Sequence, residues 1–502
     1  MSYINENGDT HLILVTMSGN EDEAINVVQN TDSHPEHVNN YGDTALLLTI
    51  HYSMERLALK ILETCNANPG HIDNHGNSAL IFCMKKSMRS VANKIIDSYN
   101  DYNINHIDAH NDTALSVALR MGYYEIANKL IDNPNCKLDS IDKQTDTPLL
   151  IAIESLGHYS ENLAETESNK ETLSPHDFSK YQEKVVSEKN LFYEKKSKYY
   201  SIVKKLLNSN RSNPSHVTKF QLTSLLLSIA KDEPEIAESI LHTNDSYPEY
   251  IGYTGDTALI LALSKNYHTV AKLILEKTSK NLSVINKSGD TALMLALSKN
   301  FQDISQKLLD SNVNSILSHI NNNGDIKLFL AINTGNENIS LQIFDTGLSN
   351  FEIISNEGTS SLIMAINNGM YTLASKIIKN GSRHLIEFIN KENDTALILT
   401  IAKQFWSLAN QIIDSGSSNA GHVNNQNDTA LILAMHMGAL DVVKNLVNKT
   451  DCNKYHKNNS GASALDICLH KSNINYNDNF ASDNALYNND KIIYDELIGL
   501  LQ

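Results

Sequence analysis

A repeat of 34 or 35 residues constrains this chain more than any other feature of its sequence. The segment GDTALILALSKN, Gly255–Asn266, returns 34 positions later as GDTALMLALSKN, Gly289–Asn300. Aligning the residue before the Thr of GDT, or its equivalent, gives thirteen units: Asp9, Asp43, Asn77, Asp112, Asp146, Leu222, Asp256, Asp290, Asp325, Thr359, Asp394, Asp428 and Ala462. One such short unit cannot bury an apolar face alone, so consecutive copies are expected to stack and cover one another.

Each unit has the pattern of two helices joined by a turn. Thr44 is expected to cap a helix from Ala45 to about Tyr52, because its hydroxyl can accept a hydrogen bond from a free N–H of the first turn. The second helix carries apolar residues at helical spacing, here Leu57, Ala58, Ile61 and Leu62. An Asn or Asp such as Asn39 then favours a tight turn, because its side chain bonds its own backbone.

These residues resemble the ankyrin repeat, whose signature runs Gly-x-Thr-Pro-Leu-His. Gly42, Thr44 and Leu46 match it, and Thr147-Pro148-Leu149 keeps the proline as well. The resemblance covers nearly the whole chain. It implies an all-α, ankyrin-type solenoid of about thirteen helix-turn-helix repeats with short β-turn fingers, as a single array over residues 1–502. The tetratricopeptide repeat has a similar period but expects Trp and Pro at fixed places, and one Trp and eight Pro do not supply them.

One departure from the ankyrin signature changes the expected contact between repeats. The histidine of the signature, which in the family links neighbouring repeats by hydrogen bonds, is replaced by an apolar residue in eleven of thirteen units, for example by Leu47 and Ile260. We therefore expect adjacent units to adhere through buried hydrocarbon instead, at about 1.5–3 kcal/mol for each buried Leu or Ile.

Two insertions interrupt the period. The step from Asp146 to Leu222 is 76 residues long. It holds an insertion over residues 158–200 that is expected to begin as a polar loop near Gly157. It should continue as a long helical spur capped by Ser174, with Pro175 and Asp177 in its first turn. The spur either folds back on its own array or serves as a docking element. An Asn-rich segment, residues 473–490, is expected to form a loop in the last unit.

Composition narrows the class of function. A net charge of −17 argues against a nucleic-acid partner, because nucleic-acid binding needs a basic surface. No run of apolar residues is long enough to span a membrane, and the first residues do not form a signal-peptide pattern. The five cysteines are scattered and form no CxxC, which is typical of reduced thiols. We therefore expect an intracellular protein in the cytoplasm, or in the host cytoplasm if the gene is viral.

Two columns of the repeat have competing interpretations. A histidine recurs five residues before the Gly position in His37, His71, His106, His216, His319, His422 and His456. One histidine per repeat does not converge on a metal, so these are expected to be packed or hydrogen-bonded finger residues, and no metal or cofactor is expected. The aspartates before Thr either supply negative charge to a helix N-terminus or form an acidic ridge for a basic partner.

The end of the first helix carries the candidate partner-binding residues. Lysines there are either solvated helix ends or part of a concave binding surface, and the more varied residues include aromatic, Met and Arg side chains that often anchor interfaces. The candidates are His51, Tyr52, Lys85, Lys86, Arg120, Met121, Lys265, Lys299, Lys403, His436 and Met437. The surface of units two to four is the favoured part.

No enzyme motif is present in the sequence: there is no P-loop, GxGxxG, HExxH or GxSxG. The expected function is a non-enzymatic protein-interaction scaffold or adaptor that binds a protein partner as a monomer, because repeat arrays expose extended concave surfaces. The Asn-, Ile- and Lys-rich composition also resembles ankyrin arrays of large DNA viruses of amoebae. The alternative is a structural or assembly protein, such as a virion component or a self-associating scaffold.

Overall fold

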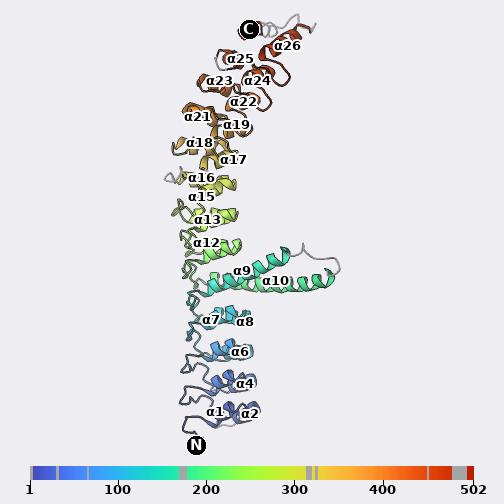
Figure 1. Ribbon diagram of the computed structural model, residues 1–502. Helices are drawn as coiled ribbons and strands as arrows, with labels where there is room; N and C mark the ends of the chain where they lie inside the picture. The colour runs from blue at the N-terminus through green and yellow to red at the C-terminus, as the bar shows by residue number, and fades with distance from the viewer. Residues whose placement is uncertain are drawn as a thin grey trace. The chain divides into compact units, whose positions relative to one another are not determined.

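The computed structural model describes residues 4–29, 33–64, 67–168, 178–311, 319–322, 326–448, 452–477 and 494–502. The chain forms two compact units, Met1–Lys280 and Asn281–Gln502. Each unit is a stack of antiparallel helix pairs joined by short fingers, and the described residues contain isolated β-bridges but no sheet (Figure 1). The predicted fold class, an all-α ankyrin-type solenoid, is confirmed.

The first unit holds helices α1 to α14. They are α1 (His11–Met17), α2 (Glu21–Val28), α3 (Ala45–His51), α4 (Glu55–Leu62), α5 (Ala79–Lys85), α6 (Arg89–Ser98), α7 (Ala114–Arg120), α8 (Tyr124–Asp132), α9 (Pro148–Ser168), α10 (Phe178–Asn208), α11 (Ser224–Ala230), α12 (Pro234–Leu241), α13 (Ala258–Ser264) and α14 (His268–Lys277).

The second unit holds helices α15 to α26. They are α15 (Ala292–Ser298), α16 (Gln302–Asp310), α17 (Lys327–Asn333), α18 (Glu337–Asp345), α19 (Ser361–Asn367), α20 (Tyr371–Asn380), α21 (Arg383–Ile386), α22 (Ala396–Ala402), α23 (Trp406–Asp414), α24 (Ala430–Met437), α25 (Leu440–Val447) and α26 (Ala464–Asn477). Residues 494–501 are helical as well.

The first helix of a repeat starts at a hydroxyl cap, as predicted. The Thr44 side chain accepts a hydrogen bond from the Leu47 N–H at 3.2 Å, and Thr257 and Thr395 cap α13 and α22 in the same way. At α17 the column holds Ile326, which has no side-chain oxygen, and the cap is absent there. The repeated Thr therefore fixes where the first helix begins.

Apolar side chains fill the space between successive repeats. Within the first unit, α1 packs on α3 and α3 on α5, while α2 packs on α4 and α4 on α6. The apolar residues that replace the signature histidine lie in these contacts: Leu47 and Ile81 are each 2% exposed. Each such residue stabilises the stack by about 1.5–3 kcal/mol.

The fingers add polar contacts between neighbouring repeats. The Nε2 of His71 lies 2.8 Å from the Gly42 carbonyl of the preceding finger, so its N–H donates there, and His37, His106, His216, His319, His422 and His456 make the equivalent bond. The predicted role of the histidine column is confirmed. The expected contact through buried hydrocarbon is confirmed by the packing described above, and this different histidine column adds hydrogen bonds between neighbouring fingers.

Each finger is a tight turn closed by one bridge. Val38 pairs with Thr44, and Oδ1 of Asn39 accepts the N–H groups of Tyr41 and Asp43, as the turn pattern predicts. Gly42 has φ of +84°, and a side chain there would both be strained and meet Asn74 of the next finger. Fingers of adjacent repeats therefore lie against each other.

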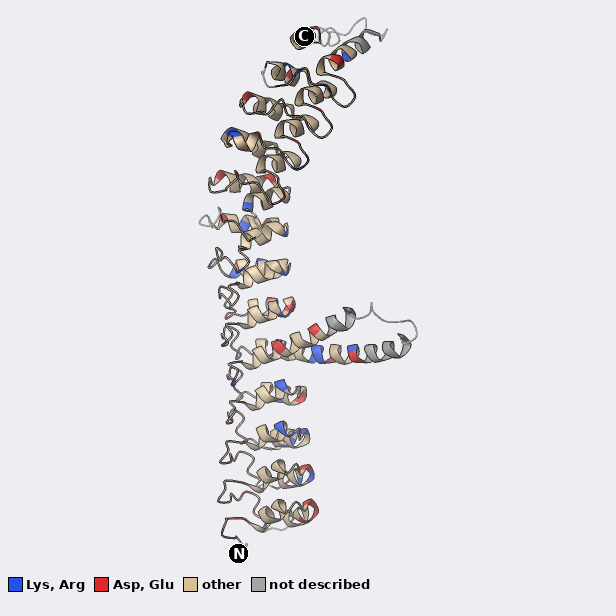
Figure 2. Cartoon of the chain, viewed as in Figure 1, with Lys and Arg blue, Asp and Glu red and all other residues tan. Residues whose placement is uncertain are grey.

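The first insertion forms a helical hairpin that projects from the stack of the first unit (Figure 1). Helix α9 continues through Gly157 to Ser168, where a polar loop was expected, and α10 runs back alongside it. The Tyr159 ring stacks on Tyr199 at 5.8 Å between centroids, and the buried Tyr199 hydroxyl donates to the Leu119 carbonyl. The base of α10 thus packs into the repeat stack. Figure 2 shows both acidic and basic residues on the hairpin.

Parts of the predictions on the insertions lie outside the described residues. These are the expected helix cap at Ser174, Pro175 and Asp177, and residues 478–490 of the expected Asn-rich loop. Residues 473–477 of that expected loop belong to α26.

Candidate functional site

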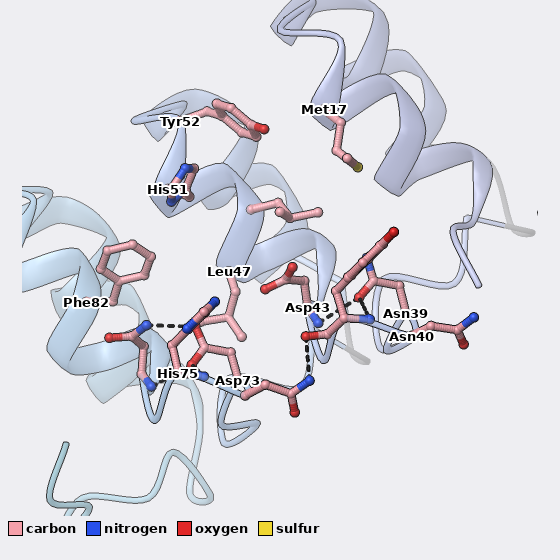
Figure 3. A pocket seen from close by; sticks show the side chains of 14 residues that line it. Met17, Asn39, Asn40, Asp43, Leu47, His51, Tyr52, Asp73, His75 and Phe82 are labelled. Carbon is pink, nitrogen blue, oxygen red and sulfur yellow. Dashed lines mark hydrogen bonds between the residues drawn. The ribbon is translucent and has the colours of Figure 1, made fainter. Parts of the chain in front are cut away.

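The N-terminal groove lies where the fingers and first helices of the first three repeats meet (Figure 3). It has a volume of about 620 Å³, and Met17, Tyr41, Asp43, His51, Tyr52, Asp73 and Phe82 contribute to its lining. These side chains come from the ends of α1 and α3, from α5, and from the fingers that precede α3 and α5. The groove lies entirely within the first unit.

Aromatic side chains form one wall of the N-terminal groove. The rings of His51 and Tyr52 meet edge to face at 5.0 Å, and His51 lies 6.3 Å from the Phe82 ring. Tyr52 is 44% exposed, and Tyr41 on the finger is 57% exposed. Large aromatic side chains left open to solvent in a hollow are typical anchors of protein interfaces.

Two carboxylates face the same hollow. Asp73 is 8% exposed and accepts hydrogen bonds from the N–H groups of His75 and Asn77 and from the Asn77 amide, at 2.7–2.9 Å. The Asp43 carboxylate makes no hydrogen bond or ion pair with any residue that the structure describes. Burial raises the pKa of Asp43, the negative charge of Asp73 raises that pKa further, and His75, His51 and His71 oppose the shift.

The isolation of Asp43 follows from one residue in the next finger. In other repeats an Asn at the position of Asp73 donates its amide to the preceding aspartate, as Asn39 does to Asp9 at 2.8 Å and Asn458 to Asp428 at 3.0 Å. A carboxylate at that position has no proton to donate at neutral pH. Asp73 therefore removes the hydrogen bond and places a like charge beside Asp43.

In the fourth and fifth repeats, the same two columns of carboxylates are paired with cations from the preceding repeat. The Lys85 ammonium lies 2.6 Å from Asp108 and 2.8 Å from Asp112, and Arg120 pairs with Asp142 and, at 3.3 Å, with Asp146. Burial opposes charge on Lys85, but the two carboxylates outweigh it and raise the pKa of Lys85. In the N-terminal groove the equivalent helix positions hold His51 and Met17 instead.

The structure brings only some of the candidate residues together. His51 and Tyr52 line the N-terminal groove, and the Lys86 ammonium lies 5.7 Å from the centre of the Phe82 ring beside it. Lys85 and Arg120 are engaged in the ion pairs described above.

The other candidates lie away from this groove. Met121 is 45% exposed on the fourth repeat, and Lys265 pairs with Asp232 at 2.6 Å. The remaining candidates, on the second unit, are exposed: Lys299, Lys403, His436 and Met437.

Sequence reasoning missed the acidic part of the groove. Asp43 has the same identity as most of its column, and its different surroundings depend on Asp73 one repeat later. The available signal was the coincidence of an Asp at position 73 with the absence of a Lys or Arg at position 51. Aligning the repeats by column and comparing charges between neighbours would have found it.

The described residues contain no group of three or more His, Cys, Asp or Glu that could hold a metal ion. None of the described helices is both long and apolar enough to cross a membrane.

Family comparisons agree with the fold. The ankyrin-repeat profile of three copies matches residues 191–284, and the single ankyrin-repeat profile matches residues 426–459. The chain therefore contains ankyrin repeats. None of the curated proteins matches its sequence.

Two solved structures are similar to part of the chain. One is the crystal structure of the ankyrin repeat domain of Bcl-3, a unique member of the IkappaB protein family: it is 19% identical, covers 42% of this chain and 94% of its own, and has a TM-score of 0.31. The other is a chain from the Bd0816 predatory endopeptidase of Bdellovibrio bacteriovorus in complex with immunity protein Bd3460. That chain is 26% identical and covers 39% of this chain and 100% of its own, with a TM-score of 0.30.

Proposed function

We propose that this protein is a non-enzymatic interaction adaptor that binds a protein partner in the N-terminal groove. Ankyrin repeats are generally protein–protein interaction modules, and repeat stacks offer extended surfaces for this purpose. The observation that carries the proposal is the groove of about 620 Å³ with the exposed rings of Tyr41 and Tyr52 on its walls. A partner side chain placed there would bury aromatic surface that the fold itself leaves open.

The proposal assigns different roles to the candidate residues. His51 and Tyr52 would contact the partner directly, with Lys86 at the edge of the groove. Lys85 and Arg120 would hold neighbouring fingers in place through their ion pairs. The remaining candidates would extend the contact along other repeats: Met121, Lys265, Lys299, Lys403, His436 and Met437. In this proposal the protein is a monomer whose repeats form a single array. It acts inside the cell, or inside the host cell if the gene is viral.

A peptide selection tests the proposal. A library of random 12-residue peptides displayed on phage is selected on the full chain, and the affinities of recovered peptides are measured by fluorescence polarisation. Tyr52→Ala and Tyr41→Ala should each weaken binding at least fivefold, because truncating an interface anchor costs more than 1 kcal/mol. Tyr455→Ala, which removes a tyrosine that is 69% exposed on another finger, is the matched control and should change affinity less than twofold.

Two outcomes would contradict the adaptor proposal. Peptides whose binding is insensitive to both groove tyrosines would show that the groove is not the binding surface. An ordered homo-oligomer in size-exclusion chromatography with light scattering, abolished by Tyr52→Ala, would instead support a self-associating scaffold.

A further inference from the structure

We propose that the N-terminal groove binds a lysine or arginine side chain of the partner, with its cationic group between the carboxylates of Asp43 and Asp73. This inference rests on the adaptor function proposed above and names the chemistry of the partner. Three observations support it: the charge of the groove, the contents of the equivalent places in the next repeats, and the walls around the carboxylates.

The first observation is an unbalanced charge. Asp43 and Asp73 face one hollow, and the side-chain carboxylate of Asp43 makes no hydrogen bond or ion pair with the described residues. Like charges in a partly buried site destabilise each other, and a cation between them would remove the repulsion and gain two attractive contacts. Histidine rings from His51, His71 and His75 lie near enough to affect Asp43 but supply no ion pair to it. A cation from outside would therefore complete the site.

The second observation comes from the chain itself. Asp108 and Asp142 occupy the column of Asp73, and Asp112 and Asp146 occupy the column of Asp43. In those repeats both carboxylates belong to one finger, and a Lys or Arg of the preceding repeat, Lys85 or Arg120, reaches both of them. Asp43 and Asp73 come from two successive fingers, so the equivalent cation positions are Met17 for Asp43 and His51 for Asp73. Each of the two columns thus accepts a Lys or Arg head group elsewhere in the chain. At the N-terminal groove the chain provides no such residue, so the position is open to a partner.

The third observation is the kind of surface around the carboxylates. Tyr41, Tyr52 and Phe82 line the same hollow, and their rings can contact the aliphatic stem of a long side chain or the face of a cation. Phe82 already has the Lys86 ammonium 5.7 Å from its ring centre. The net charge of −17 also favours the approach of a basic segment. An acidic or purely apolar segment would leave Asp43 and Asp73 uncompensated.

The peptides selected on the full chain provide the test. We expect them to share a Lys or Arg, and replacing it by norleucine or citrulline, respectively, should weaken binding at least tenfold. On the protein side, Asp43→Asn should weaken the same peptides at least fivefold. The loss should be much smaller for the peptide that already lacks its cation, since the two changes remove one interaction. His51→Lys should also weaken binding, because it supplies a cation from within, as Lys85 does in the next repeat.

The controls separate this inference from general electrostatics and from misfolding. Asp22→Asn removes the same charge from α2, on a side chain that is 80% exposed, and should change affinity less than twofold. Asp43→Asn is expected to fold, because it removes a repulsion, and circular dichroism checks this.

Failure of this inference can be distinguished from failure of the proposed adaptor function. Peptides that depend on Tyr52 but contain no required cation and ignore Asp43→Asn would overturn this inference and leave the adaptor function standing. Peptides that ignore both Tyr52→Ala and Asp43→Asn would overturn both.

Discussion

Asp43 illustrates how an aspartate of a repeated column acquires different properties from the aspartates of other repeats when one residue of the next finger, here Asp73, differs. Burial and the charge of Asp73 raise the pKa of its carboxyl above the ordinary value. A raised pKa in the folded state means that protonation favours folding, so the charged form at neutral pH destabilises the first unit. The destabilisation disappears as the pH falls through the folded-state pKa.

Asp43→Asn should therefore stabilise the first unit at pH 7. We expect the midpoint of its thermal unfolding to rise by about 1–3 °C, since 1 kcal/mol corresponds to roughly 2–4 °C in a domain of this size. The advantage over the wild type should shrink as the pH is lowered, because the protonated aspartate is then neutral as well. Scanning calorimetry at several pH values measures both effects, and an advantage that grows on acidification would contradict this account.

Burial also shifts the pKa of Lys327. It starts α17 with 0% exposure, and burial lowers its pKa to about 8. The unfolded chain then binds a proton more tightly than the folded one, so stability should rise as the pH increases from about 8 to the ordinary lysine value near 10.4. The full change is about 3 kcal/mol at 1.36 kcal/mol for each pH unit.

The measurement compares the wild type with Lys327→Met by urea unfolding between pH 7 and pH 10.5. The difference in unfolding free energy between the two proteins should fall steadily as the pH rises, because only the wild type loses its penalty. A pH-independent difference would mean that Lys327 titrates normally in the folded protein.

The residue at which a helix starts depends on a few side chains that can be recognised in the sequence. Thr44→Ala should destabilise the first unit by about 1 kcal/mol, because it removes the oxygen that accepts the Leu47 N–H. Thr44→Ser keeps that oxygen and should recover most of the loss. Chemical unfolding of the three proteins decides this, and equal losses for Ala and Ser would assign the effect to packing of the Thr methyl group instead.

The helix pairs were predictable, and the insertion was predictable only in part. Thr caps and apolar spacing identify the paired helices because the same local pattern recurs in every repeat. The segment from Gly157 to Ser168 looked like a polar loop, yet it extends α9, and Tyr159 packs against Phe192 and Tyr199 of α10. That contact joins residues far apart in the sequence, so a local pattern cannot reveal it. Likewise, the pairing of Lys85 with Asp108 depends on the next finger.

At the scale of the whole molecule, stability should be distributed along the repeats. Each repeat contacts chiefly its neighbours, so a core substitution acts locally. Leu47→Ala in the first unit and Ile398→Ala in the second truncate equivalent side chains that are each 2% exposed. Each should cost about 2–5 kcal/mol.

Hydrogen exchange read out by peptide mass spectrometry should show faster exchange in the substituted unit and little change in the other. Equal acceleration in both units would mean that the chain opens as one cooperative body.

Hydrogen exchange of the full chain, with and without a selected peptide, shows whether the N-terminal groove binds a cationic partner segment. We expect slower exchange in the fingers at residues 39–43 and 73–77 and at the end of α3, with this protection lost in Asp43→Asn. Protection that falls on the α9–α10 hairpin or on the second unit, with the fingers unchanged, would contradict it.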